Sequence, residues 1–406
     1  MLKRIRVFPR ILPAQLNPTK MVGHSIHDSS IAIVGGGTGG HIFPGVAVAN
    51  ELKQRGRRVI FFLSDRSVDQ AAAKDLSDIE LVKLPVTSFS VNSPGGFLVR
   101  LGRAFIASWK AMRPNCSALL SMGGYVGAAP ILAARCLRVP VYLHESNAIP
   151  GRANRFFSPW AEKICTGFDS AARHFLNTNV ETTGTPVRAE LRGADATASR
   201  KELGLMPDKP VLLVMGGSQG ARSINRIVFE QLAQLKSNCP NLQFLHLTGF
   251  DDFDWVTNQY KQASMPAIVR AFVSDMRPIY GAATVAVCRS GASSLAELAA
   301  TRVPSILIPL PTATDNHQWH NANIFSSAGA AILLTQTGAA AFADRCARLV
   351  NDSALRDEMS KQLSKLDAGS PITRIADILE GRCLKAHQNK VALLTLGVGV
   401  MRCTLS

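Results

Sequence analysis

The sequence predicts an α/β protein with two doubly wound domains, each built on a parallel β-sheet, and two observations carry this prediction. The first is a repeated pattern in which an apolar, β-branched run is followed by glycines or polar residues and then by a helical stretch, as in the βα units of a parallel sheet. The second is that this pattern restarts near the middle of the chain with another glycine-rich loop. The 406 residues, of which 47% are hydrophobic, suffice for two packed domains.

The first half of the chain contains four of these units. In each unit an apolar run predicts a buried strand, and the residues that follow it lie where a parallel sheet presents the carboxyl ends of its strands. The expected strands and the residues after them are 31–34 before the glycine loop 35–40, 59–63 before Ser64 and Asp65, 118–120 before 122–124, and 139–143 before His144 and Glu145.

The second half opens in the same way. Residues 211–214 run into the second glycine loop, 216–220, and a helix is expected to follow. Thr185 and Pro186 interrupt the pattern, so we place the joint between the domains at 184–188. Further strands are expected at 244–247, 284–287 and 305–308. Two Rossmann-like domains of this kind face one another across a cleft at the carboxyl ends of both sheets, where ligands of such folds bind.

The expected organisation has two folded domains and two terminal extensions. Residues 1–30 hold five basic residues and one acid without sustained periodicity, so we expect a poorly ordered basic extension. Residues 383–406 form a second basic and apolar extension. Between them we expect a first domain at 31–187, a second domain at 188–365, and a C-terminal helix at 366–382 that could return to the first domain.

The net charge of +16 invites an anionic partner: a nucleic acid, a phosphorylated small molecule or an acidic membrane surface. Only 6% of the residues are aromatic, and half of the net charge lies in residues 1–30 and 381–406, so we do not expect the protein to bind nucleic acid. The eight cysteines have no CxxC spacing, which predicts reduced thiols rather than a zinc site or a disulfide framework. No apolar run approaches the roughly 20 residues of a membrane-spanning helix.

The glycine loop 35–40 opens a helix, so its backbone N–H groups and the positive end of the helix can approach a phosphate. The loop contains GxGxxG, and the acidic Asp65 ends the next strand, as a dinucleotide-binding site requires. Two features disfavour that interpretation. His41 and Pro44 occupy the first turn of the helix, and a second glycine loop lies in the other domain, whereas a dehydrogenase needs only the first.

Six motifs follow one another along the chain: Gly36-Gly37-Thr38-Gly39-Gly40-His41 with Phe43-Pro44, Met122-Gly123-Gly124-Tyr125, His144-Glu145-Ser146-Asn147, Gly216-Gly217-Ser218-Gln219-Gly220-Ala221, Cys288-Arg289-Ser290-Gly291-Ala292 with Glu297, and 315–318 with Asn321-Ala322. Together they resemble the MurG family of peptidoglycan glycosyltransferases, whose fold is called GT-B. The resemblance covers about residues 31–380. It implies inverting transfer of N-acetylglucosamine from UDP-N-acetylglucosamine to lipid I, which gives lipid II.

The resemblance also implies residues that bind the UDP-sugar donor. Ser218 and the backbone amides of the second glycine loop would stabilise the charge that builds on the leaving group. Glu297 would accept hydrogen bonds from the ribose hydroxyls, and Val273 would contact the uracil with Met276 nearby. The other expected donor-binding residues are Thr38, Gly39, Gly40, Asn147, Arg188, Gln219, Ala292, Ser293, Leu295, His317 and Gln318.

Two residues of the first domain are candidates for the general base that removes the proton of the acceptor hydroxyl. His41 has a near-neutral intrinsic pKa that suits the role, Glu145 competes with it, and the sequence leaves the choice open. Residues 251–254 imitate a metal-binding DxD and the pair His317 and His320 imitates a metal site, but no third ligand is apparent. We expect no metal held by the protein and no tightly bound cofactor, and free magnesium on the phosphates stays open.

Apolar residues near position 100 recur at a helical period beside a basic rim. An interfacial helix meets anionic lipid in this way, and an ordinary core-facing helix with solvated charges is the alternative. The expected membrane-contact residues are Phe97, Leu98, Arg100, Leu101, Arg103, Phe105 and Trp109.

The resemblance implies a peripheral protein on the cytoplasmic face of the inner membrane, with a lipid-linked acceptor and with cell-wall synthesis or division proteins as further partners. Two other functions stay open, namely a GT-B transferase that acts on another lipid such as diacylglycerol, and a UDP-sugar epimerase of the same architecture. The chain has Ser146 where the family usually has Gln, and the segment before Asp315 is not the commonest form. These departures concern the contacts to the sugar.

Overall fold

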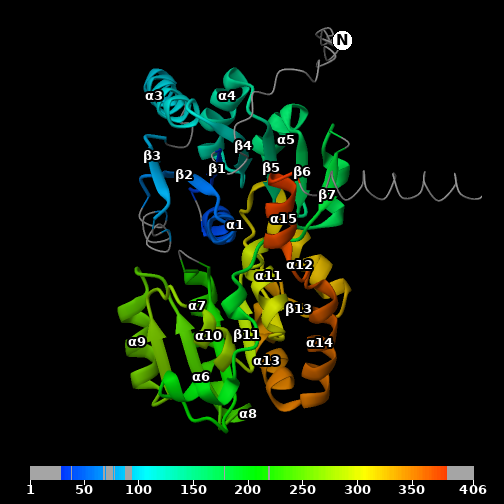
Figure 1. The fold of residues 1–406 in the computed structure, drawn as a ribbon. Helices are drawn as coiled ribbons and strands as arrows, with labels where there is room; N and C mark the ends of the chain where they lie inside the picture. The colour runs from blue at the N-terminus through cyan, green and yellow to red at the C-terminus, as the bar shows by residue number, and fades with distance from the viewer. Residues whose placement is uncertain are drawn as a thin grey trace, which may run out of the picture.

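The structure is a computed structural model that describes residues 29–37, 39–66, 69, 76, 78–86, 94–177, 179–217 and 220–381. It contains two α/β domains, one above the other in Figure 1. Both sheets are parallel and both carry helices on their two faces, which confirms the predicted fold class of two doubly wound, Rossmann-like domains. The expected extensions 1–30, apart from its last two residues, and 383–406 lie outside the described residues.

The described part of the first domain has a seven-stranded sheet in the order β3-β2-β1-β4-β5-β6-β7. Its central strands are almost wholly buried because helices cover both faces, which explains their continuous apolar character. The strands are β1 Ser30–Val34, β2 Arg58–Ser64, β3 Glu80–Leu84, β4 Cys116–Ser121, β5 Val141–Glu145, β6 Lys163–Thr166 and β7 Val180–Thr182.

The described part of the second domain repeats the arrangement with a six-stranded sheet in the order β10-β9-β8-β11-β12-β13. The strand before the second glycine loop, β8, lies between β9 and β11, so the chain completes one side of the sheet and then crosses to the other. The first domain has the same arrangement around β1. The strands are β8 Val211–Met215, β9 Gln243–Leu247, β10 Ala267–Arg270, β11 Val285–Cys288, β12 Ser305–Leu307 and β13 Ala331–Leu333.

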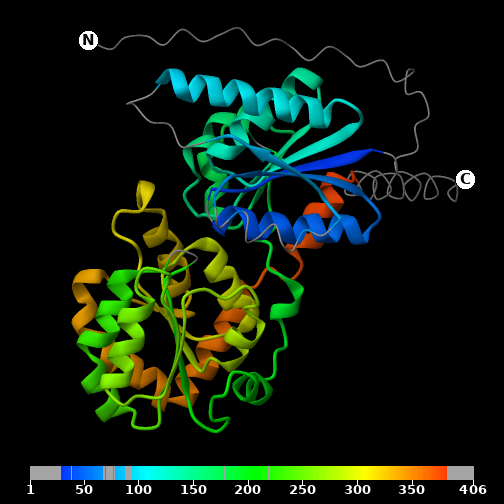
Figure 2. The ribbon, with the colours of Figure 1, turned by 90° about the vertical axis from the view of Figure 1, so that its left-hand side faces the viewer.

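Helices of the first domain pack on opposite faces of its sheet (Figure 2). One face is covered by α1 and the other by α3 with α4, each burying an apolar stripe. The α-helices whose bounds lie in the described residues are α1 Gly39–Gln54, α3 Pro94–Met112, α4 Ala128–Leu137, α5 Arg152–Phe157, α6 Ala196–Glu202, α7 Arg222–Glu230, α8 Leu232–Asn238, α9 Phe253–Gln262, α10 Arg277–Ala282, α11 Ala292–Thr301, α12 His317–Ser327, α13 Phe342–Asn351, α14 Ser353–Leu366 and α15 Pro371–Leu379.

Each expected strand is present, but several boundaries differ and five strands were not foreseen. The run expected at 139–143 forms β5 two residues later because Pro140 cannot donate to the sheet, although its carbonyl accepts a bond from the Leu119 N–H. The runs expected at 284–287 and 305–308 shift or shorten by one residue. The unforeseen strands β3, β6, β7, β10 and β13 are short and lie at or next to the edges of the sheets.

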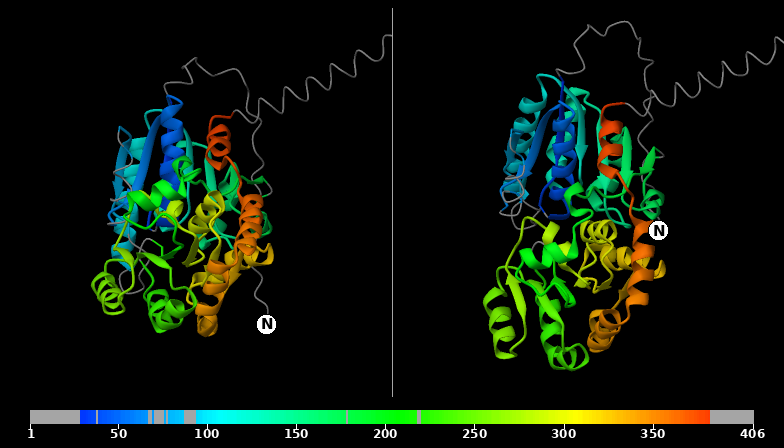
Figure 3. Two further views of the ribbon diagram at one scale, coloured as in Figure 1. Left: turned by 90° about the horizontal axis from the view of Figure 1, so that it is seen from below. Right: turned by 60° about the horizontal axis from the view of Figure 1, so that its bottom comes forward.

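The chain returns from the second domain to the first through its last described helix. α14 runs along the second domain, and the chain then passes to α15, which packs on α1 (Figure 3). Ile375 and Ala376 of α15 are fully buried in the same apolar cluster as β1. Arg55, just after α1, forms ion pairs with Asp377 at 2.6 Å and Glu380 at 2.9 Å, and these fix the returning segment to the first domain.

Candidate active site at the domain interface

Two helices from different domains begin at the same point of the interface. α1 starts at Gly39 in the first domain and α11 starts at Ala292 in the second. The Ser293 hydroxyl donates a hydrogen bond of 3.2 Å to the Gly40 carbonyl, which brings the two first turns together. The N-terminus of a helix carries unpaired N–H groups and a positive partial charge. This point of the interface therefore favours an anion.

The first glycine loop is held by the carboxylate of Asp69. Gly37 donates its N–H to both carboxylate oxygens, at 2.9 and 3.2 Å, and Ser64 donates both its N–H and its hydroxyl. Asp69 is fully buried, and a side chain at Gly36 would collide with it. The Gly37 amide is thus taken by the protein's own carboxylate and is unavailable to a bound phosphate. Thr38, predicted to bind the donor, lies outside the described residues.

His41 lies in the first turn of α1, where charges from both domains act on it. Burial lowers the pKa of His41 below its ordinary value of 6.5. The charge of Glu145 opposes this shift, His317 adds to it, and Asp69 and a hydrogen bond to the Gly36 backbone oppose it. Because the pKa lies below 6.5, the imidazole is neutral at pH 7 and can accept a proton.

Glu145 ends β5 and is enclosed by donors. One carboxylate oxygen accepts from the N–H and the side-chain amide of Asn147, at 2.9 and 3.1 Å. The other accepts from the Gly151 N–H and the Asn154 amide, each at 2.9 Å. Glu145 is 3% exposed. These four hydrogen bonds fix the buried carboxylate and shape the loop after β5.

The predicted ribose and uracil contacts gather on the second domain around Glu297. Tyr280 donates its hydroxyl to Glu297 at 2.8 Å. Burial raises the pKa of Glu297, and the hydrogen bond from Tyr280 and the charge of Arg188 oppose the shift. Arg188 donates to the Ser274 carbonyl at 3.0 Å, between the predicted uracil contacts Val273 and Met276, which pack partly on the core of the domain.

Arg188 also reaches across the interface. Its guanidinium lies 5.7 Å from the ring centre of Phe43 in α1, a distance that suits a cation–π contact. Since Arg188 lies at the joint between the domains, it touches both the first turns of α1 and the segment that carries Val273.

His317 and Gln318, both expected to bind the donor, begin α12. The Nδ1 of His317 donates to the Thr314 carbonyl at 2.7 Å, so Nε2 is the ring nitrogen left for another partner. The Oε1 of Gln318 accepts from the Leu310 N–H at 3.0 Å, which leaves its NH₂ group as a donor. Both side chains can therefore hydrogen-bond a polyhydroxyl ligand.

The second glycine loop allows two parts of the chain to approach closely. A Cβ at Gly216 would lie 2.2 Å from the Ala221 nitrogen, and one at Gly220 would lie 2.3 Å from the Thr248 carbonyl oxygen. Ser218 and Gln219, both predicted to bind the donor, lie outside the described residues. Leu295 differs from the other predicted residues of α11 because its side chain is fully buried in the core of the second domain. Only its backbone can face a ligand.

The acidic segment before α9 is engaged in the fold. Asp252 pairs with Arg222 at 2.8 Å and accepts from the Asn225 amide at 2.8 Å. Asn225 in turn bonds the fully buried His246. Within the residues that the structure describes, no three His, Cys, Asp or Glu side chains gather as a metal site.

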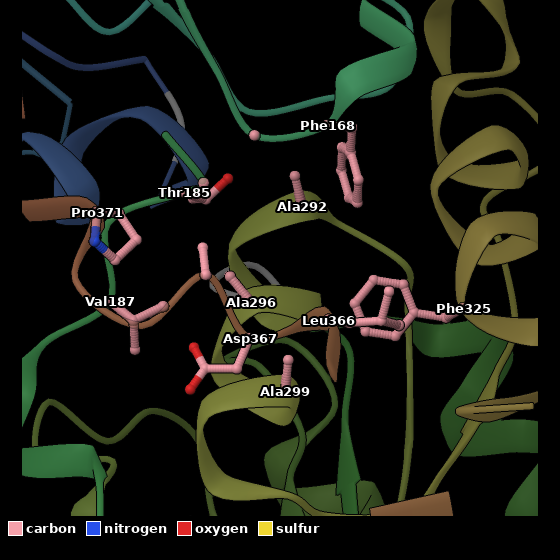
Figure 4. A pocket seen from close by; sticks show the side chains of 13 residues that line it. Phe168, Thr185, Val187, Ala292, Ala296, Ala299, Phe325, Leu366, Asp367 and Pro371 are labelled. Carbon is pink, nitrogen blue, oxygen red and sulfur yellow. The ribbon is translucent and has the colours of Figure 1, made fainter. Parts of the chain in front are cut away.

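A small cavity of about 30 Å³, here called the hinge cavity, lies where the two chain crossings between the domains meet α11 (Figure 4). Phe168 and Val187 enter from the first domain and the joint, Ala292 and Ala296 from α11, and Pro371 from the start of α15. Gly184 packs so tightly there that a Cβ would lie 2.2 Å from the Cβ of Ala368. The cavity is mostly apolar and adjoins the start of α11.

The predicted membrane-contact helix is α3, and its residues divide between two environments. Leu98 is 65% exposed and Arg100 and Arg103 are exposed, whereas Phe97 is half-buried and Leu101, Phe105 and Trp109 pack partly on the core. Sequence reasoning did not include Val99 among these contacts, although it is 57% exposed. None of the helices in the described ranges is long and apolar enough to span a membrane.

Several residues of the interface had no role assigned from the sequence. Asp69, Asn154 and Tyr280 hold the predicted site residues in place, and Asn321 bonds across the interface. Asn321 belongs to one of the six motifs, and this was its only signal. The others became visible only once the fold placed them beside their partners.

Two facing parallel-sheet domains with helix N-termini at their interface form the GT-B fold, which occurs in glycosyltransferases. The chain belongs to glycosyltransferase family 28. The model of the N-terminal domain of this family matches residues 31–166, and that of the C-terminal domain matches residues 211–376. This confirms the resemblance and the enzyme class predicted from the motifs.

Relatives with assigned functions match most of the chain. A protein of Anaeromyxobacter dehalogenans (strain 2CP-1 / ATCC BAA-258), named UDP-N-acetylglucosamine--N-acetylmuramyl-(pentapeptide) pyrophosphoryl-undecaprenol N-acetylglucosamine transferase, is 34% identical over 360 residues, which are 85% of this chain and 91% of that protein. A protein of the same name from Coxiella burnetii (strain Dugway 5J108-111) is 37% identical over 310 residues, covering 75% of this chain and 85% of that protein.

Solved structures show the same fold. MurG of Acinetobacter baumannii superposes with a TM-score of 0.66 at 25% identity, covering 87% of this chain and 99% of that chain. A UDP-N-acetylglucosamine 2-epimerase homologue of Listeria monocytogenes reaches a TM-score of 0.64 at 13% identity, covering 86% and 94%. At that identity the second likeness shows the fold alone.

Proposed function

We propose that this enzyme transfers N-acetylglucosamine from UDP-N-acetylglucosamine to the muramyl-pentapeptide pyrophosphoryl lipid called lipid I, and so forms lipid II for peptidoglycan synthesis. The relatives named above support the substrates, because they match over most of both chains. The observation that carries the proposal in the structure is the meeting of the α1 and α11 N-termini, joined by the bond between Ser293 and Gly40. A nucleotide diphosphate is the anion that this point would hold.

The reaction is a displacement at the anomeric carbon of the donor sugar. The acceptor hydroxyl oxygen forms a bond to that carbon on one face, while the bond to the phosphate oxygen breaks on the other. The electron pair of the broken bond leaves with UDP, and the configuration inverts. Two helix N-termini aimed at the diphosphate stabilise the negative charge that grows on it. The backbone of the second glycine loop would add further donors.

His41 is the better candidate for the base that takes the proton of the acceptor hydroxyl. Its depressed pKa keeps it neutral at pH 7, and it lies beside the start of α1, at the domain interface. Glu145 already accepts four hydrogen bonds and is suited to shaping the loop that carries Asn147. Its negative charge raises the pKa of His41, which makes the imidazole a stronger base.

Donor recognition falls mainly to the second domain. Glu297, with one oxygen bonded to Tyr280, would accept hydrogen bonds from the ribose hydroxyls, and the segment around Val273 would contact the uracil. His317 and the free NH₂ group of Gln318 would bond hydroxyls of the sugar. Asn147 would add a contact from the first domain.

The lipid-linked acceptor requires that the first domain approach a membrane, and α3 offers the surface. Its exposed Leu98 and Val99 would enter the lipid interface, and Arg100 and Arg103 would meet anionic headgroups. The proposed location is peripheral, on the cytoplasmic face of the cell membrane, where a nucleotide sugar and a lipid-linked acceptor meet.

The test measures UDP release from UDP-N-acetylglucosamine with a short-chain lipid I analogue, with a diacylglycerol dispersion, and with no acceptor. We expect release only with the lipid I analogue, together with a β-linked disaccharide product. Release that depends on diacylglycerol would move the assignment to another lipid acceptor. Conversion of the donor without any acceptor would favour an epimerase.

A further inference from the structure

We propose that Asn321 is a positioning residue that orients the amide of Asn147 across the domain interface, so that the contact of the first domain with the donor sugar forms only while the two domains are together. The inference rests on the proposed function, in which Asn147 contacts the donor. It assigns a role to a buried side chain that touches neither substrate.

The side-chain amide of Asn321 makes hydrogen bonds to residues of both domains. Its Oδ1 accepts a hydrogen bond of 2.9 Å from the Ala148 N–H of the first domain. Its Nδ2 donates to the Oδ1 of Asn147 at 3.0 Å and to the Ser290 carbonyl at 3.1 Å. Asn321 is completely buried, so water cannot replace a partner that is lost.

The Asn147 amide is thereby fixed at both ends. Its Nδ2 donates to Glu145 at 3.1 Å, while its Oδ1 accepts from Asn321. Rotation of this amide by half a turn would place its oxygen against the Glu145 carboxylate and its NH₂ group against that of Asn321. Only one orientation is therefore stable, and one N–H of Asn147 remains to meet a ligand in a set direction.

The same residue is tied to the donor side of the second domain. Asn321 lies in α12, one turn after Gln318, and its partner Ser290 donates its hydroxyl to the Gln318 carbonyl at 2.8 Å. A continuous set of hydrogen bonds thus runs from Glu145 through Asn147, Asn321 and Ser290 to the first turn of α12. Separation of the domains would break it at Asn321.

The test compares Asn321→Asp with Asn323→Asp. The first variant keeps an oxygen that can accept from Ala148 but places its second oxygen against the oxygens of Asn147 and Ser290. Asn323 lies in the same helix and is exposed, so it receives the same chemical change without these partners. Affinity is measured by calorimetry for UDP and for UDP-N-acetylglucosamine, because UDP lacks the N-acetylglucosamine that Asn147 would contact.

For Asn321→Asp we expect the affinity for UDP-N-acetylglucosamine to fall about tenfold or more, since one lost buried polar contact corresponds to at least that factor. Affinity for UDP should stay within about twofold, because the proposed contact of Asn147 is with the N-acetylglucosamine of the donor and not with its UDP part. In an Asn147→Ala background the Asn321→Asp effect should shrink to about twofold or less, since the oriented amide is then gone. Asn323→Asp should match the unmodified protein in both affinities.

An equal loss for UDP and for the UDP-sugar, or full additivity with Asn147→Ala, would show that Asn321 acts on structure alone and would overturn the inference. The two proposals fail separately. If the unmodified protein binds UDP-N-acetylglucosamine but transfers it to no lipid acceptor, the proposed function falls and the coupling through Asn321 is still decided by the affinities. If it binds neither UDP nor the UDP-sugar, both proposals fall.

Discussion

At the scale of single residues, His41 and Glu145 differ in what their surroundings leave them able to do. The carboxylate of Glu145 is occupied by four donors, so we propose that it holds the loop after β5 and acts on His41 through its charge. His41 is neutral at pH 7 because burial lowers its pKa. We therefore expect the histidine to act as the general base.

Replacement of His41 by Ala should lower kcat by about 10² to 10⁴, the range attributed to a general base. In the unmodified enzyme the rate should rise with pH through a pKa below 6.5 and then level off, because only the neutral imidazole accepts a proton. The variant should lose this acidic limb while its affinity for UDP stays the same. Steady-state rates from pH 5 to 8 check this, and a variant with unchanged kcat would return the role to another group.

The buried carboxyl of Glu297 leads us to predict that the binding of UDP depends on pH. Burial raises the pKa of its carboxyl, so it takes up a proton at higher pH than an exposed glutamate. Once protonated, the carboxyl loses acceptor capacity for the ribose hydroxyls, and affinity for UDP should weaken as pH falls through the raised pKa. Glu297→Gln should bind UDP weakly at every pH. Calorimetric titrations across the acidic range measure both trends, and a parallel pH trend in the variant would contradict the assignment.

Asp69 makes a prediction about stability. In Asp69→Asn an NH₂ group replaces one of the two oxygens that face the donors Gly37 and Ser64. A buried donor left without an acceptor costs about 1–3 kcal/mol, so the free energy of unfolding should fall by that amount. Asp65→Asn changes an exposed carboxylate nearby and should have little effect. Urea denaturation of both variants tests this prediction, and equal stabilities would show that Asp69 does not hold the loop.

At the scale of secondary-structure elements, the pattern of apolar residues predicted the buried strands, whereas the edge strand β3 depends on contacts with its neighbour. The runs that became β1, β2, β4 and β8 are continuous and apolar because helices cover both faces of the sheets. β3 carries exposed Glu80 and Lys83, so its sequence resembles a loop. It becomes a strand only because β2 offers an edge to pair with.

The same limit applies to α3 and to the candidate site. The helical period of α3 was visible in the sequence. The residues that partly bury Phe105 and Trp109 while leaving Leu98 exposed come from elsewhere in the first domain. In the site, the glycine loops and motif residues were predictable because their local chemistry is distinctive. The roles of Asp69 and of the motif residue Asn321 were not predictable, since they depend on partners brought together by the fold.

The exposed face of α3 predicts membrane binding. Leu98→Glu removes an exposed apolar contact and adds a negative charge beside Arg100 and Arg103, so binding to anionic vesicles should fall about tenfold or more. Met206→Glu makes a similar change at an exposed position of the second domain, where Met206 is 53% exposed, and should leave vesicle binding intact. Flotation with vesicles of phosphatidylglycerol measures both. Equal loss in the two variants would show that general charge, not α3, governs binding.

At the scale of the whole molecule, the two domains are joined by two chain crossings and by polar bonds across the interface. The joint near Gly184 and the segment before α15 pack against each other beside the hinge cavity. Polar contacts connect the domains at the candidate active site: those of Ser293 and Asn321, and the ion pair of Arg155 with Asp315 at 2.5 Å. The site is therefore complete only when both domains contribute to it.

The return of α15 predicts that its apolar face stabilises the first domain. Ile375 is fully buried against the cluster that contains β1 and α1, so Ile375→Ala should lower the free energy of unfolding by about 2–5 kcal/mol. Thr373→Ala changes an exposed side chain of the same helix and keeps the carbonyl that accepts from Arg55. It should have a much smaller effect. Thermal unfolding of both variants tests this, and equal midpoints would mean that α15 adds no stability.

The position of α15 also sets the order in which the protein is completed during synthesis. Residues 371–379 leave the ribosome after the entire second domain, yet they fill part of the apolar core of the first. Most of the first domain is therefore synthesised early, but its apolar core is completed only after α15 has been synthesised. Until α15 arrives, the apolar face of α1 that it covers is open to water and to chaperones, while the second domain can fold as an uninterrupted segment.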